Sequence, residues 1–143
     1  MFITRATRHD KDDIRELLAS REWDDNTDLN EGTAFIARDG KVVGCVRMVE
    51  VEPQTVVIDS VLVREDRRGN GIGSNLMQAA MNSRGGKLFL CCHEDRIAFY
   101  TRLGFSLLSD GFDDAPGSVK DYWRKVGDYP TDEGHEHFFM TAR

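Results

Sequence analysis

The chain has 143 residues, of which 40% are hydrophobic and 31% charged, and this composition excludes a disordered chain. At this length folding buries about 70% of the surface of the extended chain, so a core can form without disulfides or a structural metal. The net charge of −6 argues against nonspecific nucleic-acid binding, which needs a basic face. A helix needs about 20 apolar residues to cross a bilayer, and no apolar run of the sequence approaches that length. The N-terminus does not resemble a secretory signal. We therefore expect a cytoplasmic protein without membrane contact.

The first part of the chain predicts a short strand and a helix. Residues 2–7 alternate weakly between apolar and polar, as a strand does. A helix is expected from Asp10, with acidic residues in its first turn and a buried stripe formed by Ile14, Leu17 and Leu18. Residues 23–31 are acidic and rich in asparagine, and the sequence leaves their helicity open.

Three strands are expected next. Residues 33–38 and 41–51 suit strands, and Asp39-Gly40 between them is a two-residue hairpin signal. After a turn at residues 52–54, residues 55–63 are apolar on both faces, which is typical of a central strand. Strands that follow one another through hairpins are antiparallel, so this part of the chain predicts an antiparallel meander.

The remaining pattern predicts a parallel crossover. A glycine-rich turn at residues 67–74 leads into an amphipathic helix that ends at Gly85-Gly86. A buried strand at residues 88–92, a helix at residues 96–103 and a strand at residues 105–108 follow. We expect an α/β fold with a mixed sheet, in which a strand–helix–strand crossover follows the meander in one domain, residues 1–143.

The three cysteines, Cys45, Cys91 and Cys92, do not form the pattern of a disulfide framework, and we expect them to be reduced. Cys91 and Cys92 precede His93, which suggests a metal site. Adjacent residues of a strand point to opposite faces, however, so the two thiols cannot bind one ion. We therefore expect no metal.

The glycine-rich turn is the segment that indicates chemistry. Glycines at a helix start leave the first backbone N–H groups unpaired and unshielded, so that they can bind phosphate, and Arg67 and Arg68 add charge. A tight turn that needs small residues is the other interpretation. A nucleoside-triphosphate loop is disfavoured because no lysine follows Gly73, and a dinucleotide fold is disfavoured by the spacing of the glycines.

Two motifs resemble the GNAT superfamily of N-acetyltransferases. Residues 61–74, VLVREDRRGNGIGS, are similar to its acyl-CoA-binding signature R/Q-x-x-G-x-G/A, which Arg68, Gly71 and Gly73 match. Residues 98–105, AFYTRLGF, resemble the family's helix that ends in F/L-Y-x-x-L-G-F. The resemblance covers residues 1–108 and a final strand at residues 136–141. It implies the GNAT-like acyl-CoA N-acyltransferase fold.

The resemblance also implies a cosubstrate, acetyl-CoA, and the residues that hold it. Backbone amides of residues 69–74 would bind the pyrophosphate, and the strand before them would run beside the pantetheine arm, where the family has a bulge or splay. The binding residues implied are Val61, Leu62, Val63, Arg68, Gly69, Asn70, Gly71, Ile72, Gly73 and Ser74. The segment 93–97 departs from the family pattern, so its contacts with the coenzyme do not carry over.

Two catalytic residues are implied. Tyr100 occupies the family's position for the phenol that protonates or hydrogen-bonds the departing sulfur, although its ring could simply fill the space between helix and sheet. Asp59, a carboxylate in an apolar strand, is the candidate base. It could instead bind the acceptor's cation or pair with an arginine such as Arg47. His93 and Glu94 are weaker candidates for the base.

The sequence thus predicts an N-acetyltransferase that moves an acetyl group from acetyl-CoA to a primary amine of a small molecule or peptide. The alternative is a noncatalytic regulatory module that binds acyl-CoA, and a homodimer is compatible with either. Residues 109–135 are expected to be an insertion on the acceptor side. Acidic and aromatic residues in two segments favour a cationic amine, although they could equally be solvated loops. These residues are Trp23, Asp24, Asp25, Asp28, Glu31, Asp110, Phe112, Asp113, Asp114, Tyr122 and Trp123.

Overall fold

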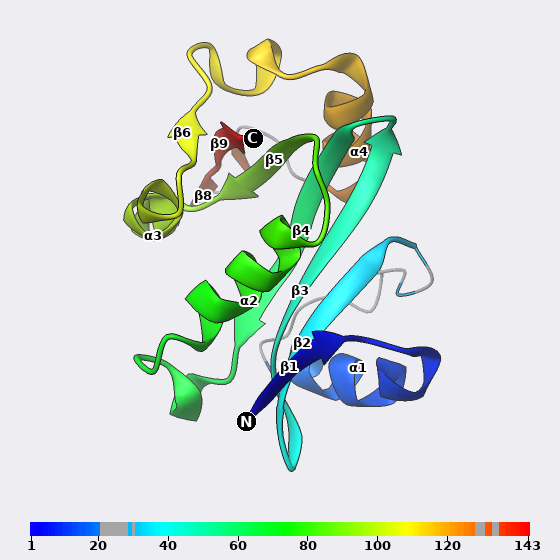
Figure 1. Ribbon diagram of the computed structural model, residues 1–143. Coiled ribbons are helices and arrows are strands. Elements are labelled where there is room, and N and C mark those ends of the chain that lie inside the picture. The colour runs from blue at the N-terminus through cyan, green and yellow to red at the C-terminus, as the bar shows by residue number, and fades with distance from the viewer. Residues whose placement is uncertain (21–28, 30, 128–130, 133–134) are drawn as a thin grey trace. The chain divides into compact units, whose positions relative to one another are not determined.

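A computed structural model describes residues 1–20, 29, 31–127, 131–132 and 135–143 (Figure 1). Its α-helices are α1 (Lys11–Ala19), α2 (Ile72–Asn82), α3 (Ile97–Arg102) and α4 (Gly117–Val126). Its strands are β1 (Phe2–Arg5), β2 (Thr33–Asp39), β3 (Lys41–Glu52), β4 (Thr55–Val63), β5 (Lys87–Cys92), β6 (Ser106–Leu107), β7 (Thr131–Asp132), β8 (His135–Glu136) and β9 (Phe138–Ala142). Short 3-10 turns are η1 (Arg8–Asp10), η2 (Glu65–Arg67), η3 (Glu94–Arg96) and η4 (Gly111–Asp114). The acidic segment at residues 23–31 lies outside the described residues except for Leu29 and Glu31.

Seven strands form one mixed sheet in the order β1-β2-β3-β4-β5-β9-β6. β4 and β5 are parallel, whereas β1 with β2, β2 with β3, and β9 with both β5 and β6 are antiparallel. The predicted α/β fold with a mixed sheet is therefore confirmed. The chain groups into two compact units, the first formed by residues 1–49 and 59–84 and the second by residues 50–58 and 85–143.

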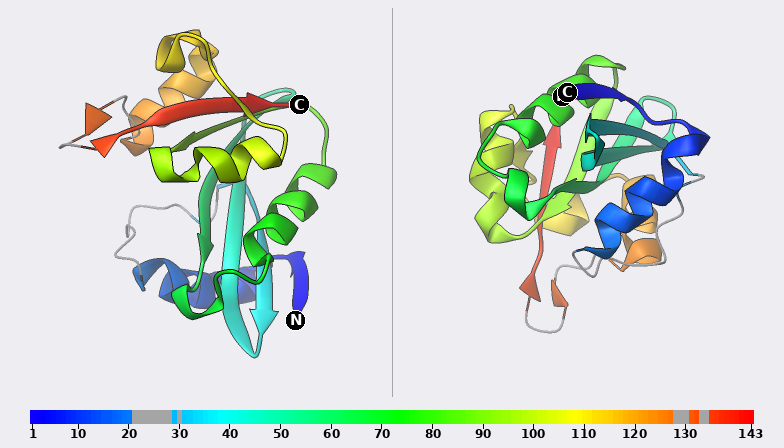
Figure 2. Two further views of the ribbon diagram at one scale, coloured as in Figure 1. Left: turned by 90° about the vertical axis from the view of Figure 1, so that its left-hand side faces the viewer. Right: turned by 90° about the horizontal axis from the view of Figure 1, so that it is seen from below.

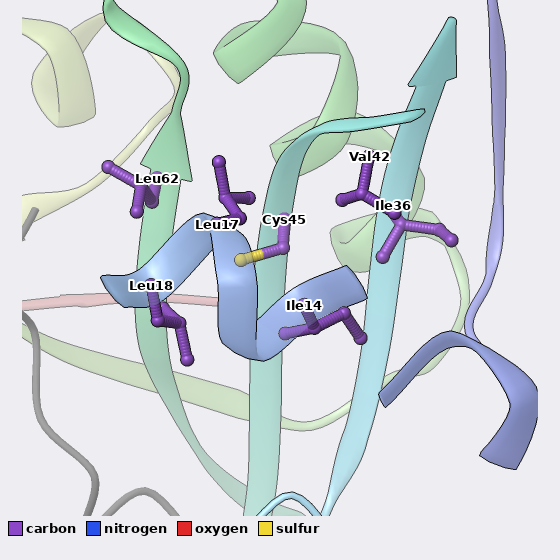
Figure 3. Close-up of a cluster of buried hydrophobic side chains, with 7 residues drawn as sticks. All are labelled: Ile14, Leu17, Leu18, Ile36, Val42, Cys45 and Leu62. Carbon is purple, nitrogen blue, oxygen red and sulfur yellow. The ribbon is translucent and has the colours of Figure 1, made fainter. Parts of the chain in front are cut away.

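In the first unit, α1 packs against one face of the sheet through the stripe that its sequence predicts. Ile14, Leu17 and Leu18 are buried, as expected. They form one cluster with residues of β2, β3 and β4 (Figure 3), and the strand residues of this cluster are Ile36, Val42, Cys45 and Leu62. The register between β2 and β3 shifts between Ala37 and Arg38, which allows Val42 and Cys45 to face α1 together despite their odd spacing.

The opposite face of the same strands carries α2 (Figure 2). Gly44 is the neighbour of Cys45 and so points the other way. A Cβ at Gly44 would lie 2.9 Å from Leu76 Cδ1 and 3.2 Å from Ile72 Cγ2, so α2 sits directly on the backbone of β3. This close approach fixes the first turn of α2 against the sheet.

The second unit contains the remaining strands and α3 and α4. Three parallel pairs join Thr55–Val57 of β4 to Lys87–Phe89 of β5. β9 begins at Phe138 and ends at Ala142, slightly later than the final strand expected at residues 136–141. The predicted strand at residues 105–108 is present as the two residues of β6.

The region 109–135 contains a helix that the sequence analysis did not predict. α4 buries Val119, Tyr122 and Trp123, and the Trp123 ring packs 4.6 Å from the Phe139 ring between centroids. Trp123 is 0% exposed, so the expectation that its ring helps to favour a cationic amine is wrong, and so is the alternative that it lies in a solvated loop. Tyr122 is buried as well, because both aromatic side chains form the core of this unit.

A bilayer-spanning helix is not found in the described part of the chain, where each helix is too short or too polar for that.

Candidate functional site

The start of α2 is formed by backbone that carries little side-chain cover. Gly69 and Gly71 have φ of 83° and 77°, a conformation that glycine adopts without strain. Apart from the glycine itself and its two neighbours in the chain, no atom of the described residues lies within 4 Å of the position that a Cβ would take at either glycine, and no side chain caps α2 at Gly71. The first helical hydrogen bond runs from Asn75 N–H to the Gly71 carbonyl, over 3.0 Å. The N–H groups of residues 72–74 precede it and form an open donor site for an anion.

The two arginines of the glycine-rich turn have different partners. Arg67 Nη1 lies 2.6 Å from Asp39 Oδ2, and this contact lowers the pKa of the Asp39 carboxyl, chiefly through the hydrogen bond. Arg68 is exposed, and its Nε donates to the Val63 carbonyl over 3.3 Å. Arg68 therefore lies beside the end of β4, where it can add positive charge to the donor site.

β4 has an irregular backbone before this turn. Ser60 has φ of 55°, which is unusual for a residue other than glycine, and the ladder to β5 ends at Val57. The left-handed residue Ser60 directly precedes Val61, the region where the resemblance implied a bulge or splay. The Leu62 side chain is buried in the α1 cluster, so only the Leu62 backbone could contact a ligand.

Hydrogen bonding fixes the direction of the backbone after Ser60. The Arg64 N–H donates to the Val43 carbonyl of β3 over 2.8 Å. Because N–H groups alternate along a strand, those of Val61 and Val63 point away from β3. These are the donors of β4 that a ligand beside the strand could reach.

Asp59 pairs with the arginine that the sequence offered as its alternative partner. Asp59 Oδ2 lies 2.7 Å from Arg47 Nη2, and the two side chains are 24% and 5% exposed. Asp59 Oδ1 accepts a hydrogen bond from Ser60 Oγ over 3.2 Å. Arg47 Nη1 donates to the Glu31 carbonyl over 2.9 Å. Both oxygens of Asp59 are therefore engaged in hydrogen bonds.

Cys45 lies next to this network. Its Sγ donates to the Ser60 carbonyl over 3.3 Å. Burial raises the pKa of the Cys45 thiol to about 12, with a further rise from Asp59 that Arg47 opposes. Cys45 is thus a protonated donor in the core, as the sequence analysis expected of a reduced cysteine.

Tyr100 lies in the second unit on α3 and is 7% exposed. Its ring makes edge contacts with Phe99 and Phe105, at centroid distances of 5.0 and 5.9 Å. Burial raises the pKa of the phenol, and Cys92 adds to this effect. The Tyr100 ring therefore packs among other aromatic side chains, and its hydroxyl remains protonated and able to donate a hydrogen bond at neutral pH.

A pair of stacked histidines was missed by the sequence analysis. The His93 and His137 rings are parallel to within 2°, with centroids 5.1 Å apart. They meet because Cys92 pairs with Phe138 across β5 and β9, a register that neither segment encodes alone. Within the described residues no group of three or more histidine, cysteine and acidic side chains is arranged to hold a metal ion.

The comparisons with known proteins identify one family. The model of the acetyltransferase (GNAT) family matches residues 3–105. The structure of N-acetylglutamate synthase from Neisseria gonorrhoeae, complexed with coenzyme A and N-acetyl-glutamate, is 17% identical with a TM-score of 0.73. The match covers 100% of this chain but 35% of the synthase chain, so this chain spans about a third of that protein.

Two further structures match over most of both chains. A GNAT family acetyltransferase from Streptococcus pneumoniae is 26% identical with a TM-score of 0.66, over 81% of this chain and 93% of the other. An aminoglycoside 6'-N-acetyltransferase complexed with coenzyme A is 19% identical with a TM-score of 0.70, over 99% and 96%. The shared fold is thus the one that the two sequence motifs indicated.

Proposed function

The chain belongs to the acetyltransferase (GNAT) family of acyl-CoA-dependent N-acetyltransferases, and from this premise we propose that it transfers an acetyl group from acetyl-CoA to a primary amine. The acceptor is a small molecule or peptide that attacks directly in a ternary complex. The observation that carries the proposal is the uncapped start of α2, whose donors at residues 72–74 suit a pyrophosphate.

The coenzyme is bound mainly by backbone in this proposal. Amides of residues 69–74 hold the pyrophosphate, and Arg68 pairs with its oxygens. The backbone of residues 61–63 runs beside the pantetheine arm, where the N–H groups of Val61 and Val63 point away from β3. One of these donors polarises the thioester carbonyl, a contribution of about 3 kcal/mol to transition-state stabilisation.

Acetyl transfer then needs one bond to form and one to break. The amine nitrogen attacks the thioester carbonyl carbon, the C–S bond breaks, and the nitrogen loses a proton. Tyr100 donates a hydrogen bond to the departing sulfur as its negative charge develops, and the thiolate leaves as such or takes a proton through Tyr100, which then regains one from water. Burial raises the pKa of Tyr100, so the phenol stays protonated at neutral pH and is better suited to donating a hydrogen bond to the sulfur than to giving up its proton.

Asp59 is the proposed residue for the proton of the amine. Its side chain is 24% exposed, and its two oxygens already accept from Arg47 and Ser60. A base role requires one of these bonds to yield, whereas binding of the acceptor's cation, with water taking the proton, leaves both in place. Asp59→Asn distinguishes the roles, since loss of a base lowers kcat and loss of a counter-charge raises KM for the amine.

A small amine is the proposed acceptor class. Two of the similar structures are an N-acetylglutamate synthase and an aminoglycoside 6'-N-acetyltransferase, which both support amines of small molecules. Asp113 and Asp114 are exposed in the region 109–135, which we still place on the acceptor side, and they favour a cationic amine. A single domain, a cytoplasmic location and a homodimer stay predictions.

The proposal is tested by thiol release from acetyl-CoA in the presence of polyamines, aminoglycosides, amino acids and peptides. Turnover with one class is expected, and Tyr100→Phe should lower kcat by about 10²-fold or more while coenzyme A still binds. Coenzyme A at about 100 times its Kd should add about 2.7 kcal/mol to the stability of the fold. Binding without turnover would favour the regulatory module, and absence of binding would contradict both.

A further inference from the structure

We propose that Arg47 is a positioning residue for coenzyme binding, because through Asp59 it holds Ser60 of β4 in its left-handed conformation. The inference rests on the proposed function, in which the backbone of residues 61–63 binds the acyl arm. We call the four side chains involved, Cys45, Arg47, Asp59 and Ser60, the Ser60 clasp.

The conformation at Ser60 needs external support. A residue with a Cβ is disfavoured at φ of 55°, and such a residue persists only where its surroundings hold it in place. The other described residue of this kind, Gln54, lies in the turn between β3 and β4, where left-handed residues are common. Ser60 instead lies inside a strand.

The clasp supplies this support by holding both the hydroxyl and the backbone carbonyl of Ser60. Ser60 Oγ donates to Asp59 Oδ1 over 3.2 Å, and Cys45 Sγ donates to the Ser60 carbonyl over 3.3 Å. Arg47 Nη2 fixes the other oxygen of Asp59 over 2.7 Å. The Ser60 hydroxyl is therefore held by a carboxylate that cannot rotate freely.

A second contact holds the Arg47 guanidinium in place. Its Nη1 donates to the Glu31 carbonyl over 2.9 Å, and its side chain is 5% exposed. The clasp thus connects β4 with β3 and with the segment that precedes β2. A buried ion pair contributes little net stability compared with apolar residues of similar size, so stability alone does not account for this arrangement.

The left-handed residue decides which N–H groups β4 offers to a ligand. Successive residues of a strand point in opposite directions, so an irregular residue changes the phase of everything after it. After Ser60, Arg64 N–H bonds to β3 and the N–H groups of Val61 and Val63 point away from it. Loss of the conformation at Ser60 would misdirect these donors, although neither Arg47 nor Ser60 need touch the coenzyme.

Two substitutions at Ser60 form a matched test. Ser60→Gly removes the hydroxyl but adopts the left-handed conformation without cost, whereas Ser60→Ala removes the hydroxyl and keeps the Cβ. Calorimetric titration with coenzyme A should give a Kd within about threefold of the wild type for the glycine variant and about tenfold weaker for the alanine variant. Equal Kd values for the two variants would overturn the proposal.

The role of Arg47 is tested by rescue. Arg47→Met should weaken coenzyme A binding by about tenfold and raise KM for acetyl-CoA more than it lowers kcat. Adding Ser60→Gly should restore the Kd to within about threefold, because glycine no longer needs the clasp. A purely structural role would lower the melting temperature without this rescue, and that result would refute the inference, as would an unchanged Kd in Arg47→Met.

The controls separate this inference from the proposed function. If the wild type binds no coenzyme A, the proposed function fails. If the wild type binds it and the Ser60 pair shows no difference, only the positioning role fails. The Ser60 pair also keeps the inference testable if Arg47→Met does not fold, since Ser60 is only partly buried.

Discussion

The helical segment formed by η1 and α1 begins differently from α2, because η1 has a side-chain cap and α2 has none. Each helix begins with backbone N–H groups that have no partner within the helix. Before α1, the Thr7 side chain accepts from His9 N–H over 3.2 Å, and Asp10 Oδ2 accepts from Thr7 N–H over 2.8 Å. Asp12 and Asp13 add negative charge to its first turn. α2 begins at Gly71 with neither a side-chain cap nor an acidic residue in the described first turn.

We propose that this difference separates a helix start that serves stability from one that serves a ligand. The side chains of Thr7 and Asp10 cap η1, and Asp12 and Asp13 complement the dipole of α1, so negative charge already surrounds this helix start and disfavours an anion. At α2 no side chain caps the first N–H groups, and two left-handed glycines before the helix leave open space where a Cβ would lie. The bound anion of the coenzyme would take the place of the missing cap.

The largest expected effect comes from placing a carboxylate at the start of α2. Gly71→Asp and Gly71→Asn have side chains of the same shape, and both residues tolerate φ of 77°. The charge of the aspartate repels the pyrophosphate, so its Kd for coenzyme A should rise by about 100-fold, and that of the asparagine variant by about tenfold or less. Calorimetric titration measures both, and equal losses would show that charge at this position is irrelevant.

The corresponding change at α1 should affect stability and leave binding intact. Asp10→Asn weakens the cap at Thr7 and the ion pair of Asp10 with Arg38, whose Nη2 lies 2.8 Å away. We expect a loss of about 1 kcal/mol in the free energy of unfolding, measured in urea. The Kd for coenzyme A should equal that of the wild type, and a shift of more than a few fold would remove the contrast between the two helix starts.

Lowering the pH should reduce the stability that the Asp10 carboxylate contributes. The pKa of Asp10 is lowered in the folded state, first by the Thr7 backbone hydrogen bond and further by Arg38. Its stabilisation is therefore complete above the unfolded pKa of about 3.9 and is lost as the pH falls through the folded pKa. The gap in unfolding free energy between the wild type and Asp10→Asn should shrink from pH 6 to below pH 3. A constant gap would mean that the Asp10 charge contributes nothing.

The smallest expected effect is on the reactivity of the Cys45 thiol, which lies in the buried cluster between α1 and the sheet. The pKa of Cys45 is raised to about 12 by burial, so its thiolate is scarce at pH 8. A colorimetric thiol reagent should react first with Cys91, which is only partly buried, and with Cys45 only after unfolding. The variant Cys91→Ser is the control. Rapid labelling of Cys45 in the folded state would show that α1 does not close this cluster.

Local patterns predicted the parts of the fold that depend on local chemistry. The Asp39-Gly40 hairpin, the α1 stripe and the glycine-rich start of α2 are each determined by neighbouring residues, and the structure contains all three. The ion pair of Asp59 with Arg47 was one of the alternatives considered, because a carboxylate in an apolar strand needs a partner.

Other features depend on contacts between distant segments. The acidic composition of residues 109–135 hid α4, although Val119, Tyr122 and Trp123 have the spacing of a buried helical stripe. The stacking of His93 on His137 follows from the register of β5 and β9. The left-handed residue of β4 is a serine rather than a glycine, so its sequence carried no signal of the conformation.

The proposed function requires that backbone amides at residues 69–74 bind the pyrophosphate of coenzyme A. Amide chemical shifts of the ¹⁵N-labelled protein, followed by NMR during titration, test this residue by residue. We expect these six amides to shift with coenzyme A and with adenosine diphosphate, but not with pantetheine, which lacks the pyrophosphate. Shifts confined to other residues, or equal responses to pantetheine, would contradict it.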